Sequence, residues 1–185
     1  MLDVSLKGKK LLLVGGLNNT VDIIDLAHRN DVTVGVADYN KKTYAKSLAD
    51  YAHDVNAYDE DAMVRLCEEE HYDGIITAFN ERLGPIVRKL ADRLGMPAPF
   101  TVEQLQMSTN KKFFKHTCQQ YGVPVPQEYV IRSEEDIRNG ELEYPVIIKP
   151  IDAASSVGVT PCHNREELIT GFEKAKKASK SGDVI

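Results

Sequence analysis

The first residues that could do chemistry are a lysine and the loop that follows it. Residues 144–149 (YPVIIK) form an apolar run typical of a buried strand, and the run ends in Lys149. A lysine at the end of a buried strand is costly unless it pairs with an anion or an acid. Residues 152–158 are small and hydroxyl-rich, so this loop could lie over phosphate groups and offer them backbone N–H groups and hydroxyls. A solvent-facing lysine on an edge strand, beside an ordinary hairpin loop, is the alternative.

A second pair of cations opens a helix that we predict at residues 111–121. Asn110 comes directly before Lys111 and Lys112. The helix dipole favours acids rather than cations in the first turn. A cation there is better explained if it binds an anion together with the helix N-terminus. A solvated lysine pair is the alternative.

Glycines and polar residues follow the strands predicted in the first hundred residues. Gly15 and Gly16 end an apolar run, where glycine lets a ligand approach the backbone. Asp38 closes the next strand about 20 residues later, where a dinucleotide-binding fold places its ribose acid. The GxGxxG fingerprint is incomplete, because Leu-Asn-Asn-Thr follows Gly16. Gly15, Gly16 and Asp38 still leave an NAD(P)-binding oxidoreductase as an alternative function. No P-loop motif occurs, which argues against a P-loop NTPase.

Composition argues against several classes of protein. The 185 residues carry 23 basic and 28 acidic side chains, a net charge of −5, which disfavours binding to a nucleic-acid backbone. The three cysteines are far apart and stand in no CxxC or His cluster, so neither a disulfide framework nor a zinc site is expected. A reduced, cytosolic compartment is expected instead. No apolar run approaches the roughly 20 residues of a membrane helix, and the N-terminus lacks the apolar core of a secretory signal.

Strand and helix signals alternate over the first hundred residues. Strands are predicted at 10–16, 32–37 and 74–79, with a short one around Val55, and helices at 20–29, 59–70 and 83–94. This alternation indicates βαβ crossovers and a parallel sheet with helices on both faces. Pro97 and Pro99 break the pattern, and we place a domain boundary there.

The second part of the chain has a mixed α+β pattern. Helices are predicted after Thr101, at 111–121, after Ser133 and after Asn164, and strands at 128–132, 144–149 and 157–161. Residues 183–185 resemble the opening of another strand. Because a native chain does not normally end in mid-strand, we expect this sequence to be the N-terminal part of a longer protein.

Three motifs, taken in order, resemble the first half of an ATP-grasp domain. They are NKKFFKHTCQQYGVPVP at 110–126, YPVIIKP at 144–150 and DAASSVGV at 152–159. This is the fold of biotin carboxylase, carbamoyl phosphate synthetase, the purine-pathway ligases and D-alanine–D-alanine ligase, and SSVG is particularly similar to the peptide-ligase branch. Residues 1–99 resemble the Rossmann-like domain that precedes the ATP-grasp core. Residues 100–185 would be the first part of that core, with a lid at about 123–182.

The resemblance implies roles for individual residues. Lys111, with Lys112 as the fallback, would contact the ATP phosphates, and Lys149 would contact the α- or β-phosphate. The loop closing over the β- and γ-phosphates would be Ala154, Ser155, Ser156, Val157 and Gly158. Asn110 stands where an aspartate is often found, but it can still cap the helix. The adenine-binding hinge and the Mg²⁺ ligands of the family would lie beyond residue 185, so no metal ligand is assigned.

The function implied is that of an ATP-dependent carboxylate–amine ligase. Such enzymes transfer the γ-phosphoryl group of ATP to a carboxylate, which releases ADP and forms an acylphosphate, and an amine or other nucleophile then displaces the phosphate. The partners would be small molecules rather than nucleic acid or membrane, and a homodimer is one option for the assembly. The 185-residue chain alone is expected to be inactive. A non-catalytic nucleotide-binding module is a further alternative.

The first domain is expected to help hold the acceptor substrate, because ligands bind at the carboxyl ends of strands in open α/β sheets. Glu81 follows a predicted strand and could meet an amine, and Arg82 could meet a carboxylate. A solvated charged turn is the alternative for this pair. The expected substrate-binding residues are Gly15, Gly16, Asn18, Asp38 and Glu81.

Overall fold

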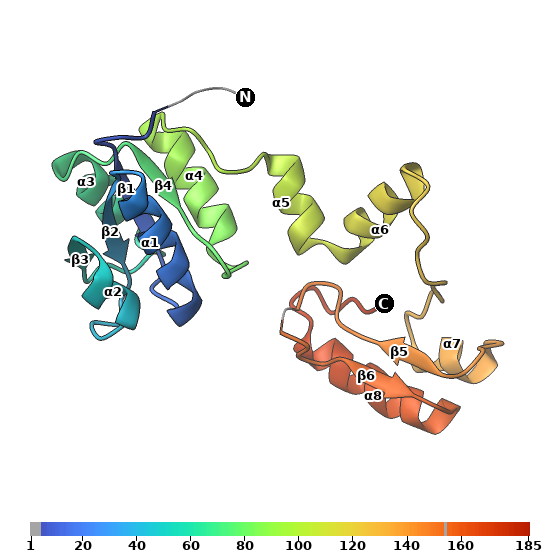
Figure 1. Cartoon of the computed structure of the whole chain (residues 1–185). Helices are drawn as coiled ribbons and strands as arrows, with labels where there is room; N and C mark the ends of the chain where they lie inside the picture. The colour runs from blue at the N-terminus through green and yellow to red at the C-terminus, as the bar shows by residue number, and fades with distance from the viewer. Residues whose placement is uncertain (1–4, 154) are drawn as a thin grey trace. The chain divides into compact units, whose positions relative to one another are not determined.

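The computed structural model describes residues 5–153 and 155–185. The chain divides into two compact units, Met1–Leu105 and Gln106–Ile185, which we call unit 1 and unit 2 (Figure 1). Helix α5 (Val102–Thr109) crosses the division. It begins with the expected reciprocal cap, in which Thr101 and Gln104 each bond the backbone N–H of the other through the side chain.

Unit 1 is built around a parallel sheet of four strands. They are β1 (Lys10–Val14), β2 (Thr33–Ala37), β3 (Tyr51–His53) and β4 (Gly74–Ile76). Their order is β3-β2-β1-β4, and every neighbouring pair is parallel. β1 is central, and its Leu12 lies in register with Gly35 of β2 and Ile75 of β4. The predicted α/β fold class is confirmed.

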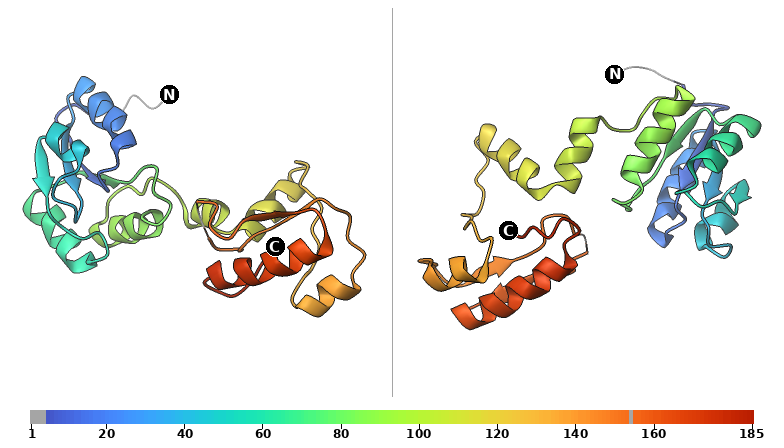
Figure 2. Two further views of the ribbon diagram at one scale, coloured as in Figure 1. Left: turned by 90° about the horizontal axis from the view of Figure 1, so that it is seen from below. Right: turned by 180° about the vertical axis from the view of Figure 1, so that it is seen from behind.

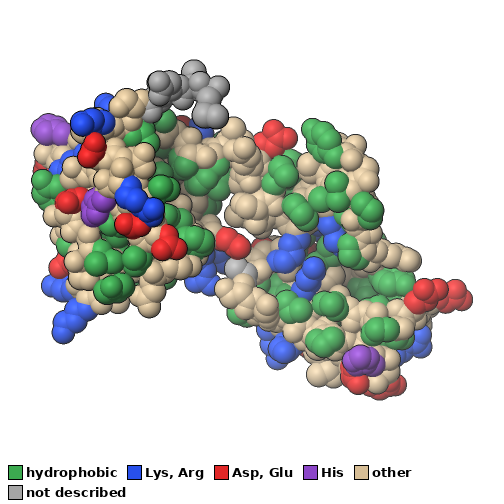
Figure 3. All heavy atoms as spheres, in the orientation of Figure 1, with side chains coloured by type: hydrophobic (Ala, Val, Ile, Leu, Met, Phe, Trp, Pro, Cys, Tyr) green, Lys and Arg blue, Asp and Glu red, His purple; other side chains and the backbone are tan. Residues whose placement is uncertain are grey.

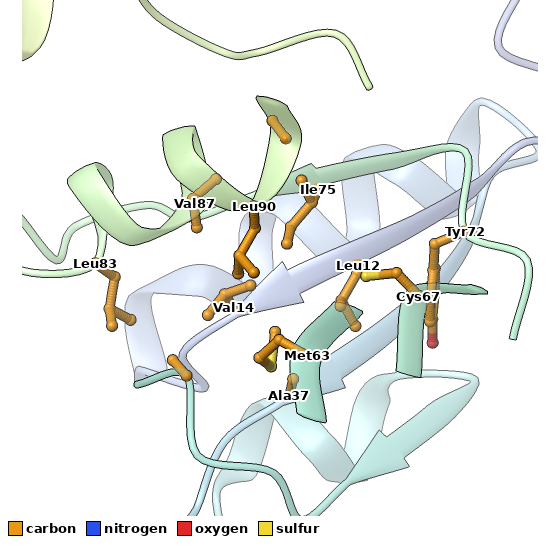
Figure 4. Packing of buried hydrophobic residues seen from close by; sticks show 12 residues of the cluster. Leu12, Val14, Ala37, Met63, Cys67, Tyr72, Ile75, Leu83, Val87 and Leu90 are labelled. Carbon is orange, nitrogen blue, oxygen red and sulfur yellow. The ribbon is translucent and has the colours of Figure 1, made fainter. Parts of the chain in front are cut away.

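Helices cover both faces of this sheet. They are α1 (Val21–Arg29), preceded by the 3₁₀ helix η1 (Asn18–Thr20), then α2 (Tyr44–Leu48), α3 (Glu60–Glu69) and α4 (Gly84–Leu94). Successive side chains of β1 point to opposite faces. Leu12 packs in one cluster with Met63 of α3 and Leu90 of α4 (Figure 4), and Leu13 packs in the other with Ile24 of α1. The predicted helices at 20–29, 59–70 and 83–94 are confirmed.

The edge strand of unit 1 differs from its prediction. The strand expected around Val55 is wrong, because β3 ends at His53. The next residue, Asp54, accepts a hydrogen bond from the ammonium group of Lys46 at 2.8 Å. The side chain of Lys46 is only 5% exposed, so this bond pins the chain where it leaves the sheet. The strand predicted at 74–79 is shorter as well and ends at Ile76.

Unit 2 holds a two-stranded antiparallel sheet, β5 (Val146–Ile148) and β6 (Thr160–Cys162), with Ile147 opposite Pro161. Its helices are α6 (Lys111–Gln120), α7 (Glu134–Asn139) and α8 (Arg165–Ala178). Helix α8 packs along the two strands (Figure 2). The core cluster joins Ile148 of β5 and Cys162 of β6 to Leu168 and Phe172 of α8. The caps predicted at Ser133 and Asn164 are confirmed.

Two strands predicted in unit 2 need correction. Residues 128–132 form no strand, because their alternating pattern finds no neighbouring strand to pair with, and Val130 is 76% exposed. The strand predicted at 157–161 lies instead at 160–162. It starts later because Ser155, Ser156 and Gly158 have φ of 55°, 57° and 74°, which no strand accommodates. No helix in the described part of the chain is long and apolar enough to cross a membrane.

Candidate functional site

Helix α6 carries the first predicted phosphate ligand to the base of the loop after β5. Asn110 caps the helix by accepting hydrogen bonds from the N–H groups of Lys112 and Phe113. Lys111 therefore lies in the first helical turn. Its ammonium group donates to the carbonyl oxygens of Ala153, at 2.7 Å, and Ile151, at 3.3 Å. Two motifs about 40 residues apart in the sequence thus meet at one point.

The second lysine is held at the end of β5 by its backbone. The N–H and carbonyl of Lys149 pair with the carbonyl and N–H of Ile185, both at 2.9 Å, and Ile151 donates to the carbonyl of Asp183 at 3.2 Å. Residues 149–151 therefore run antiparallel to 183–185, as expected of an opening strand there. The Lys149 side chain is half-buried and has no ion-pair partner among the described residues.

The loop after Lys149 has an unusual backbone. Ser155 and Ser156 are consecutive non-glycine residues with positive φ, and both side chains are exposed. Gly158 also has positive φ, and a Cβ on it would lie 2.7 Å from the Ala178 Cβ and 2.8 Å from the Pro150 Cγ. Only glycine fits there. Turns of this kind aim successive N–H groups toward one side, where they can bind an anion. Ala154, another predicted loop ligand, lies outside the described residues.

A pocket of about 400 Å³ adjoins Lys149 within unit 2. Its walls are mostly apolar and come from β5, the segment 126–131 and the end of the chain at Val184 and Ile185. An ion pair between Lys115 of α6 and Glu128 forms part of the wall. In the space-filling view, Lys and Arg side chains gather between α6 and the loop after β5 (Figure 3). An apolar slot next to cations suits a flat heterocycle that carries phosphates.

Asp152 is a residue of this site that the sequence did not single out. Its carboxylate accepts three hydrogen bonds from the segment 179–181. Burial raises the pKa of Asp152, but these bonds outweigh it and hold the pKa below its usual value. A lone aspartate in a small-residue loop carries no signal for such partners, because they lie beyond the next helix.

The predicted residues of unit 1 also meet, at the carboxyl edge of its sheet. Asp38 accepts hydrogen bonds from the N–H groups of Gly16 and Asn40, both at 2.8 Å, so both of its oxygens are engaged by the protein. A Cβ on Gly16 would lie 2.4 Å from the Thr43 Oγ1, which fills the space beside it. Asn18 opens η1 at the same edge. Asp38 thus organises two loops at this edge, and its role as a substrate ligand stays a prediction.

The loop after β4 brings further side chains to this edge. Phe79 has φ of 58° and is 66% exposed, which is rare for an aromatic residue. The Asn80 side chain accepts the N–H of Arg82 and begins the turn into α4. Glu81 and Arg82 are exposed and have no ion-pair partner within the described ranges. The role of Glu81 as a substrate ligand stays a prediction.

No group of three or more His, Cys, Asp or Glu side chains in the described part of the chain could hold a metal ion. The site carries its positive charge on Lys111 and Lys149. It joins two lysines, a loop with turned N–H groups and an apolar slot, all within unit 2. Such an arrangement can bind a polyphosphate and stabilise charge on it.

The family model for the D-Ala–D-Ala ligase C-terminus matches residues 117–182, which include Lys149 and the loop. Over 94% of this chain, the structure resembles N5-carboxyaminoimidazole synthetase from Staphylococcus aureus complexed with ADP, with a TM-score of 0.77 and 22% identity. In the sequence of residues 117–182 and in its fold, the chain resembles the ATP-grasp ligases. The match covers 47% of the length of that structure.

Curated relatives point to the same superfamily. A formate-dependent phosphoribosylglycinamide formyltransferase of Wolinella succinogenes is 24% identical over 172 residues, which is 91% of this chain and 44% of the relative. A D-alanine–D-alanine ligase of Pseudomonas entomophila is 28% identical over 139 residues, which is 71% of this chain and 43% of the relative. The chain thus spans less than half the length of these relatives.

Proposed function

We propose that the whole protein is an ATP-dependent ligase that joins a small carboxylate to an amine through an acylphosphate, with release of ADP. One observation carries the proposal. The 2.7 Å bond from the Lys111 ammonium to the Ala153 carbonyl brings the start of α6, the end of β5 and the small-residue loop into one site. Three separate sequence motifs thereby converge on a single phosphate-sized region.

The residues present fit ATP. The ammonium groups of Lys149 and Lys111 would pair with phosphate oxygens. Ser155, Ser156, Val157 and Gly158 would cover the β- and γ-phosphates with N–H groups and hydroxyls, while the pocket of about 400 Å³ beside Lys149 would take the adenine.

Phosphoryl transfer needs positioning and charge stabilisation more than covalent help from the protein. Lys149 and Lys111 would hold the triphosphate and offset the negative charge that spreads over the transferring group. The loop at 155–158, once closed, would exclude water and so protect an acylphosphate from hydrolysis before the amine arrives.

Magnesium is the metal that we propose for this reaction. When bound, it would neutralise phosphate charge. The described residues do not make a site for it by themselves, because no suitable cluster occurs among them. Every role given above therefore belongs to the side chains and backbone of this chain.

We further propose a division of labour between the two parts. Residues 1–99 would act as the Rossmann-like domain and hold the acceptor at Gly15, Gly16, Asn18 and Glu81. Residues 100–185 would begin the ATP-grasp domain, with a lid at about 123–182. The enzyme would be cytoplasmic and related in mechanism to carbamoyl phosphate synthetase, and it would use small molecules rather than nucleic acid or membranes.

Oxygen-isotope transfer tests this function. With a carboxylate substrate labelled with ¹⁸O, an acylphosphate mechanism moves one label into inorganic phosphate and releases ADP. We expect Lys149→Ala in the complete enzyme to abolish this transfer, and Lys174→Ala, which removes an exposed lysine of α8, to leave it intact. Release of AMP and pyrophosphate, or full activity of Lys149→Ala, would contradict the proposal.

A further inference from the structure

The carboxylate of Asp152 ties the start of the loop to the turn after α8. Its Oδ1 accepts hydrogen bonds from the Ser179 hydroxyl at 2.8 Å and the Lys180 N–H at 3.0 Å, and its Oδ2 accepts the Ser181 N–H at 2.8 Å. These donors lie 27 to 29 residues along the chain. Three donors on one carboxylate make a strong and directional anchor.

The backbone on both sides of Asp152 is hydrogen-bonded to a second element, α6. The carbonyls on either side of it, of Ile151 and Ala153, accept the hydrogen bonds of the Lys111 ammonium. A three-residue stretch is thus bonded to α6 through its carbonyls and to the end of α8 through its carboxylate. Any shift of Asp152 would therefore shift Lys111 and the loop relative to one another.

The far end of the loop meets the same short segment. Gly158 packs so closely against Ala178 that an added Cβ would lie 2.7 Å from the Ala178 Cβ. Ala178 is the residue directly before Ser179. Residues 178–181 therefore contact both ends of the loop. They bind Asp152 through hydrogen bonds and Gly158 through van der Waals contact.

The charge of Asp152 has to be accommodated in a site that we assign to phosphates. An ionised carboxylate in a partly buried place needs hydrogen-bond donors, because burial disfavours its charged form. The three bonds from residues 179–181 supply those donors and favour the ionised form, so the pKa of Asp152 lies below its usual value despite burial. The carboxylate thus stays ionised at neutral pH and can anchor the loop through these three bonds.

We propose that Asp152 is a positioning residue for the phosphate loop. Through residues 179–181 it sets the separation between Lys111 and residues 155–158, and so determines the affinity for a triphosphate chain. The inference rests on the proposed function, because it takes ATP as the ligand. It predicts that Asp152 acts on the phosphates of a nucleotide and not on its adenosine part.

Isothermal titration calorimetry of the complete protein tests this, because the adenine-binding hinge and the Mg²⁺ ligands of the family would lie beyond residue 185. The probes are MgATP and AMP, and the variants are Asp152→Ala, Asp152→Asn and the control Glu173→Ala, which removes an exposed carboxylate of α8. We expect Asp152→Ala to weaken MgATP binding about tenfold and AMP binding hardly at all. Asp152→Asn keeps one acceptor oxygen and should fall between, and Glu173→Ala should match the wild type.

The outcomes separate this inference from the proposed function. If wild type binds MgATP and Asp152→Ala binds it equally well, or if MgATP and AMP weaken together, Asp152 has no positioning role. If the complete wild-type protein binds neither nucleotide, the proposed function fails, and the inference fails with it. Should Asp152→Ala not fold, Ser179→Ala removes one of the three donors and should weaken MgATP selectively by a smaller factor.

Discussion

The ammonium group of Lys111 lies 2.7 Å from the carbonyl oxygen of Ala153. Lys111 is the first residue of α6, and Ala153 lies in the loop that follows β5. The bond is a charge-assisted one, which is stronger than a bond between neutral groups. It gives the loop a fixed starting point at a cation, as a phosphate-binding loop requires.

Lys111→Ala should weaken MgATP binding and speed hydrogen exchange at the amides of residues 155–158. It removes both bonds to the loop base and one proposed phosphate ligand, so we expect about a tenfold loss of affinity. Lys112→Ala is the matched control, because Lys112 is the exposed neighbour in the same helical turn. A larger loss in Lys112→Ala would transfer the phosphate role to Lys112.

Gly158→Ala should destabilise unit 2 and displace the loop. The new Cβ would meet Ala178 and Pro150 below 3 Å, and φ of 74° is strained for alanine, so we expect the free energy of unfolding to fall by about 2 to 4 kcal/mol. Gly122→Ala is the control, because Gly122 has φ of 70° but open space around it. Equal urea midpoints for the two variants would show that the contact with Ala178 is unimportant.

The free energy of unfolding should decrease as the pH is lowered, because of His53. Burial lowers the pKa of His53, against a smaller opposing effect of Glu70, and its ring bonds the Tyr72 hydroxyl at 2.7 Å. The unfolded chain therefore binds more protons than the folded one just below the ordinary value of 6.5, and the free energy of unfolding decreases as pH falls through it.

Urea unfolding at pH 7.5 and at pH 5.5 should show this decrease in the wild type and a smaller one in His53→Gln. Glutamine stays neutral and can still bond Tyr72. His163→Gln changes an exposed histidine and should behave as the wild type does. If His53→Gln keeps the full pH dependence, other groups produce it.

Asp38→Ala should loosen the carboxyl edge of the sheet in unit 1. It leaves the N–H groups of Gly16 and Asn40 without their acceptor, which should lower the free energy of unfolding by about 1 to 3 kcal/mol. In the complete enzyme we also expect a higher KM for the acceptor substrate. Glu68→Ala, an exposed carboxylate of α3, is the control for stability. Unchanged stability in Asp38→Ala would contradict the organising role.

Much of the fold and the outline of the site were predictable from the sequence. Hydrophobic periodicity located α1, α3 and α4, and apolar runs located β1, β2 and β5, because burial of one face or of both faces leaves a local pattern. Lys111, Lys149 and the loop stood out because cations and small residues are costly or unusual at those points of a strand or helix.

The tertiary structure alone decided the rest. Residues 128–132 have the alternation of a strand but find no partner, and β3 ends at His53 because Lys46 holds the next residue. Asp152 gave no signal, since its partners at 179–181 come only after the intervening helix. Local patterns record which side of an element is buried. Hydrogen bonds between distant segments leave no period in the sequence, and they decide which residues share a site.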